Sequence, residues 1–176
     1  MACNQTISGL TQDCATSMGG VAEVYLANYD DVASVTVISN KVSAITMEST
    51  AKFKKYYFRP NTASMTSTLN IDVAAGVNFV QTLLTLLFSR METSKRVELS
   101  ALAVNDLACI VCDSNGIYWY LGEQNPVIAN AGDGQTGTAK TDANRYSITL
   151  EDNNGTFPKE ILVGTTDGVD LDSIVA

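Results

Sequence analysis

The sequence has no histidine among its 176 residues. Histidine is the most frequent general base and metal ligand in proteins, and without it no serine can form a hydroxyl–imidazole pair. The glutamates, moreover, fall at no spacing that would pair two of them for acid–base chemistry. We therefore expect no enzymatic activity, no catalytic or metal site and no cofactor.

Charged residues are also scarce. They make up only 17% of the chain, against 45% apolar residues, and the net charge is −8. A chain of this length and apolar content can bury the core of one domain and is not typical of a disordered protein. An acidic surface repels nucleic acid, which argues against a DNA-gripping role but suits a surface that DNA slides past.

Long apolar runs are absent. The run Leu83–Phe88 is too short to span a bilayer. The first residues, Met1–Gln5, have neither the basic region nor the apolar core of a signal peptide. We expect the protein to be synthesised in the cytoplasm and not to associate with a membrane.

The four cysteines do not form a recognisable framework. Cys109 and Cys112 have zinc-like spacing, but they lie in an apolar run typical of a strand, where residues three apart point to opposite faces. Together with Cys3 and Cys14 they would make an irregularly spaced metal site, and disulfides are a further alternative. We expect buried or free thiols.

The clearest structural pattern is a long β-hairpin. Apolar and polar side chains alternate over Ser64–Val73, as in a half-buried strand. A small-residue break, Ala74–Gly76, separates it from the run Val77–Phe88, which is apolar on both faces near its end and is favoured as a strand over a helix. Because a hairpin of this length is marginal alone, we expect neighbouring molecules to complete it.

Shorter strands are predicted on both sides of the hairpin from β-branched composition, alternation and turn residues. They are Val21–Ala27, Val32–Ile38, Val42–Glu48, Leu107–Cys112, Ile117–Leu121, Arg145–Glu151 and Pro158–Val163. The turn Asn115-Gly116 is typical of a tight hairpin. These elements predict a mainly β fold, an antiparallel β-sandwich or barrel.

One helix, Met91–Val104, is expected to flank the β-structure. Glu92 and Arg96 form an i,i+4 pair of opposite charge, and Thr93 or Ser94 can cap the start. Apolar residues along the segment form a stripe that would face the core. They are Val97, Leu99, Ala101, Leu102, Ala103 and Val104.

A long polar loop is predicted over Gly122–Asn144. Within it, Gly132–Gly137 matches the G-x-G-x-x-G pattern. That pattern binds a pyrophosphate only between a strand and a helix N-terminus, and here the next predicted element is a strand. We therefore expect a flexible loop.

Basic residues interleave with aromatic residues in one place, Lys52–Arg59. Such a pattern can indicate nucleic-acid binding. On an acidic chain we favour a strand with an apolar inner face and a basic face that docks against an acidic neighbour during self-assembly.

The chain divides into three predicted parts. Residues 1–20 form an N-terminal arm with little structure of its own, residues 21–163 form the β domain, and residues 164–176 form an acidic C-terminal tail.

In this order of elements the chain resembles bacteriophage tail tube proteins, including those of Bacteroides phages. The resemblance is carried by Val24–Asp31, by the long hairpin Thr68–Arg90, by the helix Glu92–Val104 and by Ile117–Gly122. It implies a fold similar to the inner tube of type VI secretion systems and a structural, self-assembling virion protein. Alternatives are a single-ring or connector protein of a short-tailed gut phage, and a β-sandwich adhesin or other binding module.

The resemblance implies hexameric rings that stack into a tail tube in the virion, assembled in the host cytoplasm. Hairpins of neighbouring subunits would line a lumen through which DNA passes without specific binding, and a hexamer would carry about −48 charges, at −8 per chain. Other partners would be sheath, terminator and baseplate or ring proteins.

Two sets of residues are assigned to this assembly. The subunit interface and lumen are assigned to Thr68, Asn70, Ile71, Asp72, Asn78, Gln81, Thr82, Leu84 and Leu86. Contacts between rings are assigned to Lys52, Lys54, Lys55, Arg59, Gly132 and Gly134.

Overall fold

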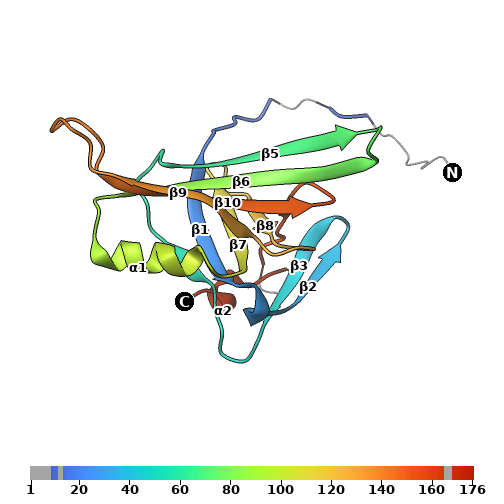
Figure 1. The fold of residues 1–176 in the computed structure, drawn as a ribbon. Helices are drawn as coiled ribbons and strands as arrows, with labels where there is room; N and C mark the ends of the chain where they lie inside the picture. Colours follow the sequence, from blue (N-terminus) through green and yellow to red (C-terminus); the bar gives the residue numbers. More distant parts are fainter. Residues whose placement is uncertain (1–8, 12–13, 165–167) are drawn as a thin grey trace.

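The computed structural model describes residues 9–11, 14–164 and 168–176 (Figure 1). Its elements are β1 (Val21–Asn28), the 3-10 turn η1 (Tyr29–Asp31), β2 (Val32–Ile38), β3 (Lys41–Met47), β4 (Lys54–Tyr56), β5 (Ala63–Asp72), β6 (Val77–Ser89), α1 (Thr93–Leu102), β7 (Leu107–Asp113), β8 (Tyr118–Leu121), β9 (Ile128–Gln135), β10 (Arg145–Asn154), β11 (Lys159–Glu160) and α2 (Leu171–Ile174).

The strands form two main sheets and a separate hairpin. One sheet has the order β11-β8-β7-β1-β4, the other has the order β5-β6-β10-β9, and β2 pairs with β3. Every pairing between these strands is antiparallel. The mainly β, sandwich-like fold predicted from the sequence, with a long hairpin and a flanking helix, is confirmed.

The main core lies between the two sheets. From the β5-β6-β10-β9 sheet, β6 contributes Leu84 and Leu86 and β10 contributes Ile148 and Leu150. β7 faces them with alternate residues and uses the others against a second core, so that it is buried on both faces. This explains its near-continuous apolar sequence.

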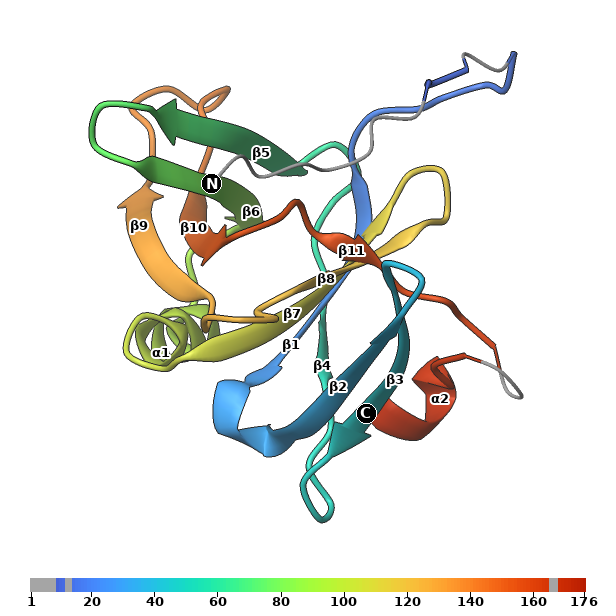
Figure 2. The same cartoon turned by 90° about the vertical axis from the view of Figure 1, so that its right-hand side faces the viewer.

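The second core lies on the other face of the five-stranded sheet, under the β2–β3 hairpin and α2 (Figure 2). Val169 and Ile174 are buried there, and Val175 forms a β-bridge with the fully buried Phe53. Residues 168–176, which belong to the predicted acidic tail, are therefore packed on the domain, where their apolar side chains fill a space beside the sheet.

The predicted loop Gly122–Asn144 contains a strand. β9 pairs with β10 along its length, with a bulge opposite Thr149 and Leu150. Its small and polar residues have low strand propensity, so pairing with β10 rather than local sequence explains its conformation. The adjacent strand β10 also runs on through Asp152–Asn154, three residues past its predicted end at Glu151.

The helix is confirmed, but its buried stripe is not the predicted one. Leu102 is buried and Leu99 packs on the main core, whereas Val97 and Val104 are exposed. Glu92, which precedes the helix, pairs with Arg90 and with Lys95 rather than with Arg96.

The hairpin between β7 and β8 forms as predicted. Gly116 has a φ of +81°, which glycine adopts readily. The Asp113 carboxylate accepts hydrogen bonds from the backbone N–H groups of Asn115 and Ile117, at 2.8 and 3.0 Å. These bonds hold the pKa of Asp113 below its usual value, against the opposing effect of partial burial.

The predicted N-terminal arm is described over residues 9–11 and 14–20, and these carry no helix or strand. The remainder of the arm lies outside the described residues. Met18 exchanges two hydrogen bonds with the Asn115 side chain, and the Gly20 carbonyl accepts from Ser114 N–H. The end of the arm is thus attached to the β7–β8 turn.

Candidate assembly surface

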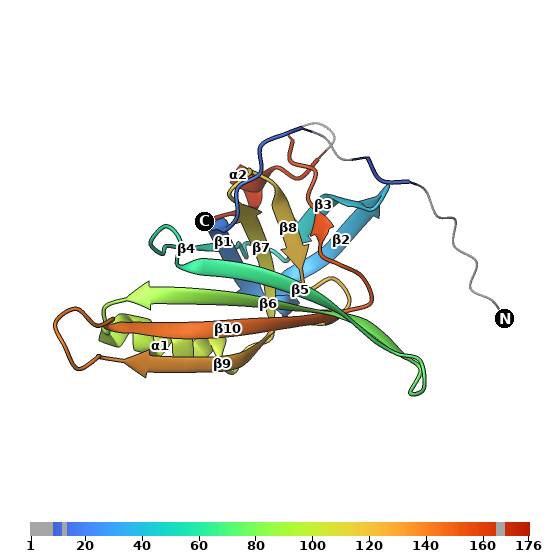
Figure 3. The same ribbon diagram turned by 90° about the horizontal axis from the view of Figure 1, so that it is seen from above.

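The sheet β5-β6-β10-β9 has one face on the main core and one polar face turned away from it (Figure 3). The strand register decides which residues share a face. Thr68 lies opposite Gln81 and Asp72 lies opposite Val77, so even-numbered residues of β5 share the polar face with odd-numbered residues of β6. We call this surface the polar face.

A hydrogen-bond network around Glu151 organises the polar face. The side-chain amides of Gln81 and Asn153 donate to Glu151 Oε1 at 2.8 and 2.7 Å, and Asn130 donates to Oε2. These bonds hold the pKa of Glu151 below its usual value, the Gln81 bond contributing most. The carboxylate therefore ties β6, β9 and β10 together in its charged form.

Hydroxyl groups cover the neighbouring part of the polar face. Thr85 and Thr149 form a cross-strand pair whose Oγ1 atoms are 3.2 Å apart. Ser147 donates to the Asp133 carboxylate across the β9–β10 ladder. The face is rich in hydroxyl and amide groups and also carries Leu83 and Leu87 of β6, and its polar groups are aligned along the strands rather than convergent.

The predicted lumen residues separate into two groups on the sheet. Thr68, Asn70, Asp72 and Gln81 lie on the polar face, in agreement with the pattern from which they were chosen. Asp72 has a second role, because its Oδ1 accepts from the N–H groups of Ala74 and Ala75 and so closes the hairpin turn.

The prediction was wrong for three residues of β6. Thr82, Leu84 and Leu86 are each at most 1% exposed and point into the chain's own core. Ser67 and Thr82 hydrogen bond within it at 2.8 Å. The register explains this difference, because it places even-numbered residues of β6 on the opposite face from Thr68, Asn70 and Asp72.

Ile71 and Asn78 lie opposite each other at the far end of the hairpin, also on the face away from the polar one. The hairpin extends there past β9 and β10 (Figure 3). Leu69 and Ile71 are 45% and 62% exposed on this face, and Val73 in the turn is 89% exposed. An apolar surface of this kind on a protruding strand is typical of a contact site.

Both edges of this sheet lack a partner strand within the described residues. β5 stands at one edge and β9 at the other. Natural proteins protect such edges with proline, lysine or inward-pointing charge. Neither Ala63–Asp72 nor Ile128–Gln135 contains a proline, lysine or arginine. We call these two the open edges.

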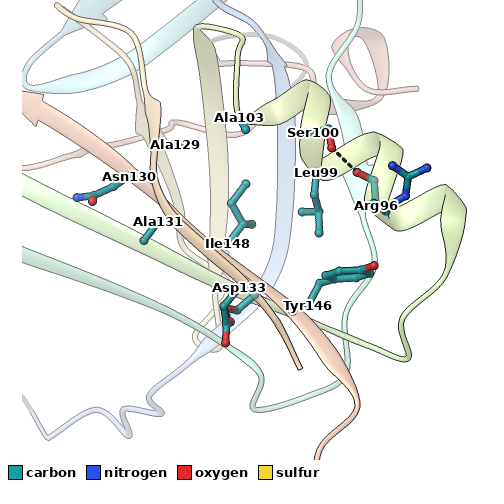
Figure 4. A pocket seen from close by; sticks show the side chains of 13 residues that line it. Arg96, Leu99, Ser100, Ala103, Ala129, Asn130, Ala131, Asp133, Tyr146 and Ile148 are labelled. Atoms are coloured by element: carbon teal, nitrogen blue, oxygen red, sulfur yellow. Dashed lines mark hydrogen bonds between the residues drawn. The ribbon is translucent and has the colours of Figure 1, made fainter. Parts of the chain in front are cut away.

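A groove of about 420 Å³ runs between α1 and the core-side face of β9 (Figure 4). Its helix side is formed by Arg96, Leu99 and Ala103, and its strand side includes Ala129 and Gly132. Apolar side chains such as Leu99 and Ile148 line the groove together with polar ones, among them Asn130 and Asp133.

The glycines predicted for contacts between rings have a structural explanation. A Cβ atom on Gly134 would lie 2.8 Å from Cε1 of Tyr146, and one on Gly132 would lie 3.2 Å from the Ser147 carbonyl oxygen. Both glycines are in β9 and not in a flexible loop. The G-x-G-x-x-G pattern runs out of this strand and is followed by the next strand, β10, without a helix, so it does not form a pyrophosphate site.

The basic segment does not form one basic face. Lys55 is held within the chain, 2.6 Å from Glu23 and over the rings of Tyr25 and Tyr57. Its ammonium is thus already paired within the chain, which makes it a weaker candidate for a contact between rings than the other basic residues of the segment. Of the expected strand, only β4 forms. Phe53 packs in the second core and Tyr56 packs against the main core, and the chain leaves the sheet after Tyr56.

Lys52, Lys54 and Arg59 are exposed. Lys52 reaches only the Val175 carbonyl oxygen, at 3.5 Å, and Arg59 lies in the connection that leads into β5. These three remain candidates for a contact with another molecule.

The thiols are free in the described part of the chain. Cys109 and Cys112 are buried, Cys14 is exposed, and Cys3 lies outside the described residues. Burial raises the pKa of the Cys109 thiol, which makes it unreactive. Among the described residues, no group of three or more metal-ligating side chains could hold a metal ion.

The residues that sequence reasoning missed belong to β10. Ser147, Thr149, Glu151 and Asn153 alternate with buried residues and make the centre of the polar face. The signal is visible in the sequence, where the apolar Ile148 and Leu150 alternate with these polar residues.

No helix in the described part of the chain has both the length and the apolarity needed to cross a bilayer. Comparisons of the chain with protein-family models, with curated proteins and with solved structures found no match. A function must therefore be inferred from the surface described above.

Proposed function

We propose that this chain is a structural protein of the bacteriophage tail tube type, whose copies join edge to edge into rings. The observation that carries the proposal is the four-stranded sheet with its two open edges. Strand directions alternate across β5, β6, β10 and β9, so β5 and β9 run antiparallel to each other. A second copy can therefore place its β5 beside β9 and continue the antiparallel pattern without interruption.

A contact of this kind can close into a ring, depending on the rotation that relates one copy to the next. The β5 edge and the β9 edge are different surfaces, so their contact is head-to-tail, and a head-to-tail contact closes into a ring when the rotation between copies is right. The polar face then becomes the inner wall and the five-stranded sheet the outer body. Closing the ring also pairs both open edges with neighbouring strands, as in a closed β-barrel, so that no edge is left exposed.

The charges of the polar face suit a conduit for DNA. Asp72, Asp133 and Glu151 give the wall three carboxylates, against Arg145 on the same face. An acidic, hydroxyl-rich wall repels phosphate and offers no bidentate donor array. The proposed partners are further copies in stacked, hexameric rings, other tail proteins, and DNA in passage through the virion.

Contacts between stacked rings are proposed for the exposed basic residues and for the arm that ends at Gly20. Among the described residues, Lys52, Lys54 and Arg59 form no short ion pair. A neighbouring acidic ring would attract them. The same edge contact would serve a single ring in a short-tailed phage.

A pair of proline variants tests the edge contact. Adjacent strand residues point their N–H groups to opposite edges, so Thr66→Pro and Ser67→Pro differ in which edge loses a donor. We expect one variant to unfold, because its N–H bonds β6, and the other to stay a folded monomer that no longer assembles. Light scattering and circular dichroism distinguish the two results. Two variants that fold and assemble like the unmodified protein would contradict the proposal.

A further inference from the structure

The exposed apolar side chains of the hairpin and the groove beside α1 lie on the same side of the β5-β6-β10-β9 sheet. Leu69 and Ile71 are odd-numbered residues of β5 and face away from the polar face. Ala129 and Gly132 of β9 also face the core side, opposite Leu150 and Ile148. If copies join β5 to β9, the hairpin residues of one copy therefore lie on the groove side of the next.

The register decides whether they reach the groove. Across one copy, Ala63 is level with Leu86, Ile148 and Gly132 in turn. Without any stagger, the neighbour's β9 would pair with the first half of β5 and leave the apolar half uncovered.

Closing a sheet into a barrel requires the strands to tilt by roughly 35–45°. Over four strands about 4.8 Å apart, this tilt staggers one copy against the next by roughly 13–19 Å, about four to six residues. A stagger toward the start of β5 would carry β9 off the strand. A six-residue stagger toward the hairpin turn places Leu69 level with Gly132 and Ile71 level with Ala129 of the neighbour.

We propose, on the basis of the proposed function, that Leu69 and Ile71 of one copy fill the groove between α1 and β9 of the next. The groove stays unfilled in one chain, because small residues of β9, among them Ala129 and Gly132, line it together with Leu99 and Ala103. Two large aliphatic side chains of a second copy supply the missing apolar volume. α1 thus forms one wall of the groove at each contact between subunits.

Two aspartate variants test this assignment from its two sides. Ile71→Asp places a charge on the hairpin, and Ala103→Asp places one in the groove. Both residues are exposed in the single chain, so both variants should fold. Each has a matched control, Ile38→Asp with an equally exposed isoleucine at 61%, and Val104→Asp at the next position of the chain, which lines a different surface.

The decisive measurement is the mass in solution of each variant alone and of a one-to-one mixture. Each aspartate variant alone should lose at least 90% of its assembled species and run as a monomer, and both controls should assemble normally. In the mixture, the intact hairpin of Ala103→Asp chains can enter the intact groove of Ile71→Asp chains. The reverse contact carries two charges, so the mixture should give a one-to-one dimer and nothing larger.

Assembly of either variant like the unmodified protein would overturn the inference, as would a mixture that gives no dimer or controls that are equally impaired. These results leave the proposed function standing when the unmodified protein still forms rings. If the unmodified protein never assembles, the proposed function fails first, and the two failures are thereby distinguished.

Discussion

Asp152 is a buried carboxylic acid on the core side of the four-stranded sheet. It is 2% exposed and lies opposite Thr82 on the core side of β10. Asn154 donates to its Oδ1 at 2.5 Å. Burial raises the pKa of Asp152 to about 6 despite this bond. Asn154 in turn accepts from the N–H groups of Gln124 and Asn125, at 3.2 Å each, so this polar group attaches the connection before β9 to the sheet.

The raised pKa of Asp152 predicts that ionising this residue lowers the stability of the folded protein. A folded-state pKa above the unfolded value near 3.9 means that the stability is fully present below pH 4 and is lost as the pH rises through about 6. Asp152→Asn keeps an acceptor for Asn154 without the charge. We expect it to stabilise the protein by roughly 1–3 kcal/mol at pH 7.5 and by much less at pH 4.5.

Urea unfolding at the two pH values measures this difference, with Ile71→Asp in both proteins to keep them monomeric. A free energy difference between them that does not change with pH would show that Asp152 titrates normally in the folded state.

Gly134 is a second residue whose role the structure reveals. Its missing side chain leaves room for the Tyr146 ring, which a Cβ would approach to 2.8 Å. We expect Gly134→Ala to destabilise the monomer by about 1–2 kcal/mol, as overpacking does. Gly132→Ala should be nearly neutral, since its Cβ meets one backbone oxygen at 3.2 Å and alanine removes some of the backbone entropy that glycine loses on folding.

A double-mutant cycle provides the control. If the ring is the cause, Gly134→Ala should cost much less in a Tyr146→Ala background. Equal costs in both backgrounds would place the cause elsewhere.

Among the elements, the long hairpin shows what a sequence can and cannot specify. β5 and β6 were predicted nearly to the residue because their signals, alternation in β5 and composition in β6, are local. Which residues share a face was not, since that depends on the length of the turn between Asp72 and Val77. Four turn residues set Thr68 opposite Gln81, and a turn one residue longer would reverse the assignment.

β9 shows the opposite case. Its sequence, Ile128–Gln135, has two glycines and two alanines and little strand propensity. It becomes a strand because β10 supplies the ladder, and because its small side chains make space for Tyr146 and for the groove beside α1. Neither cause leaves a local periodicity in the sequence.

The whole molecule separates body from wall. The five-stranded sheet is covered on both faces, by the two cores, and gives the body its rigidity. The four-stranded sheet is covered on one face and ends in two open edges. One copy thus leaves three surfaces of this sheet exposed, namely the polar face, the protruding hairpin and the groove beside α1. A single edge-to-edge contact between copies would make the polar face an inner wall and place the hairpin residues in the groove.

Electron microscopy of the purified protein in negative stain, together with its mass in solution, tests this account most directly. The account predicts closed rings, or tubes of stacked rings, with a stain-filled central hole. A monomer that persists at the highest attainable concentration would contradict it and would favour a binding module built on the same fold.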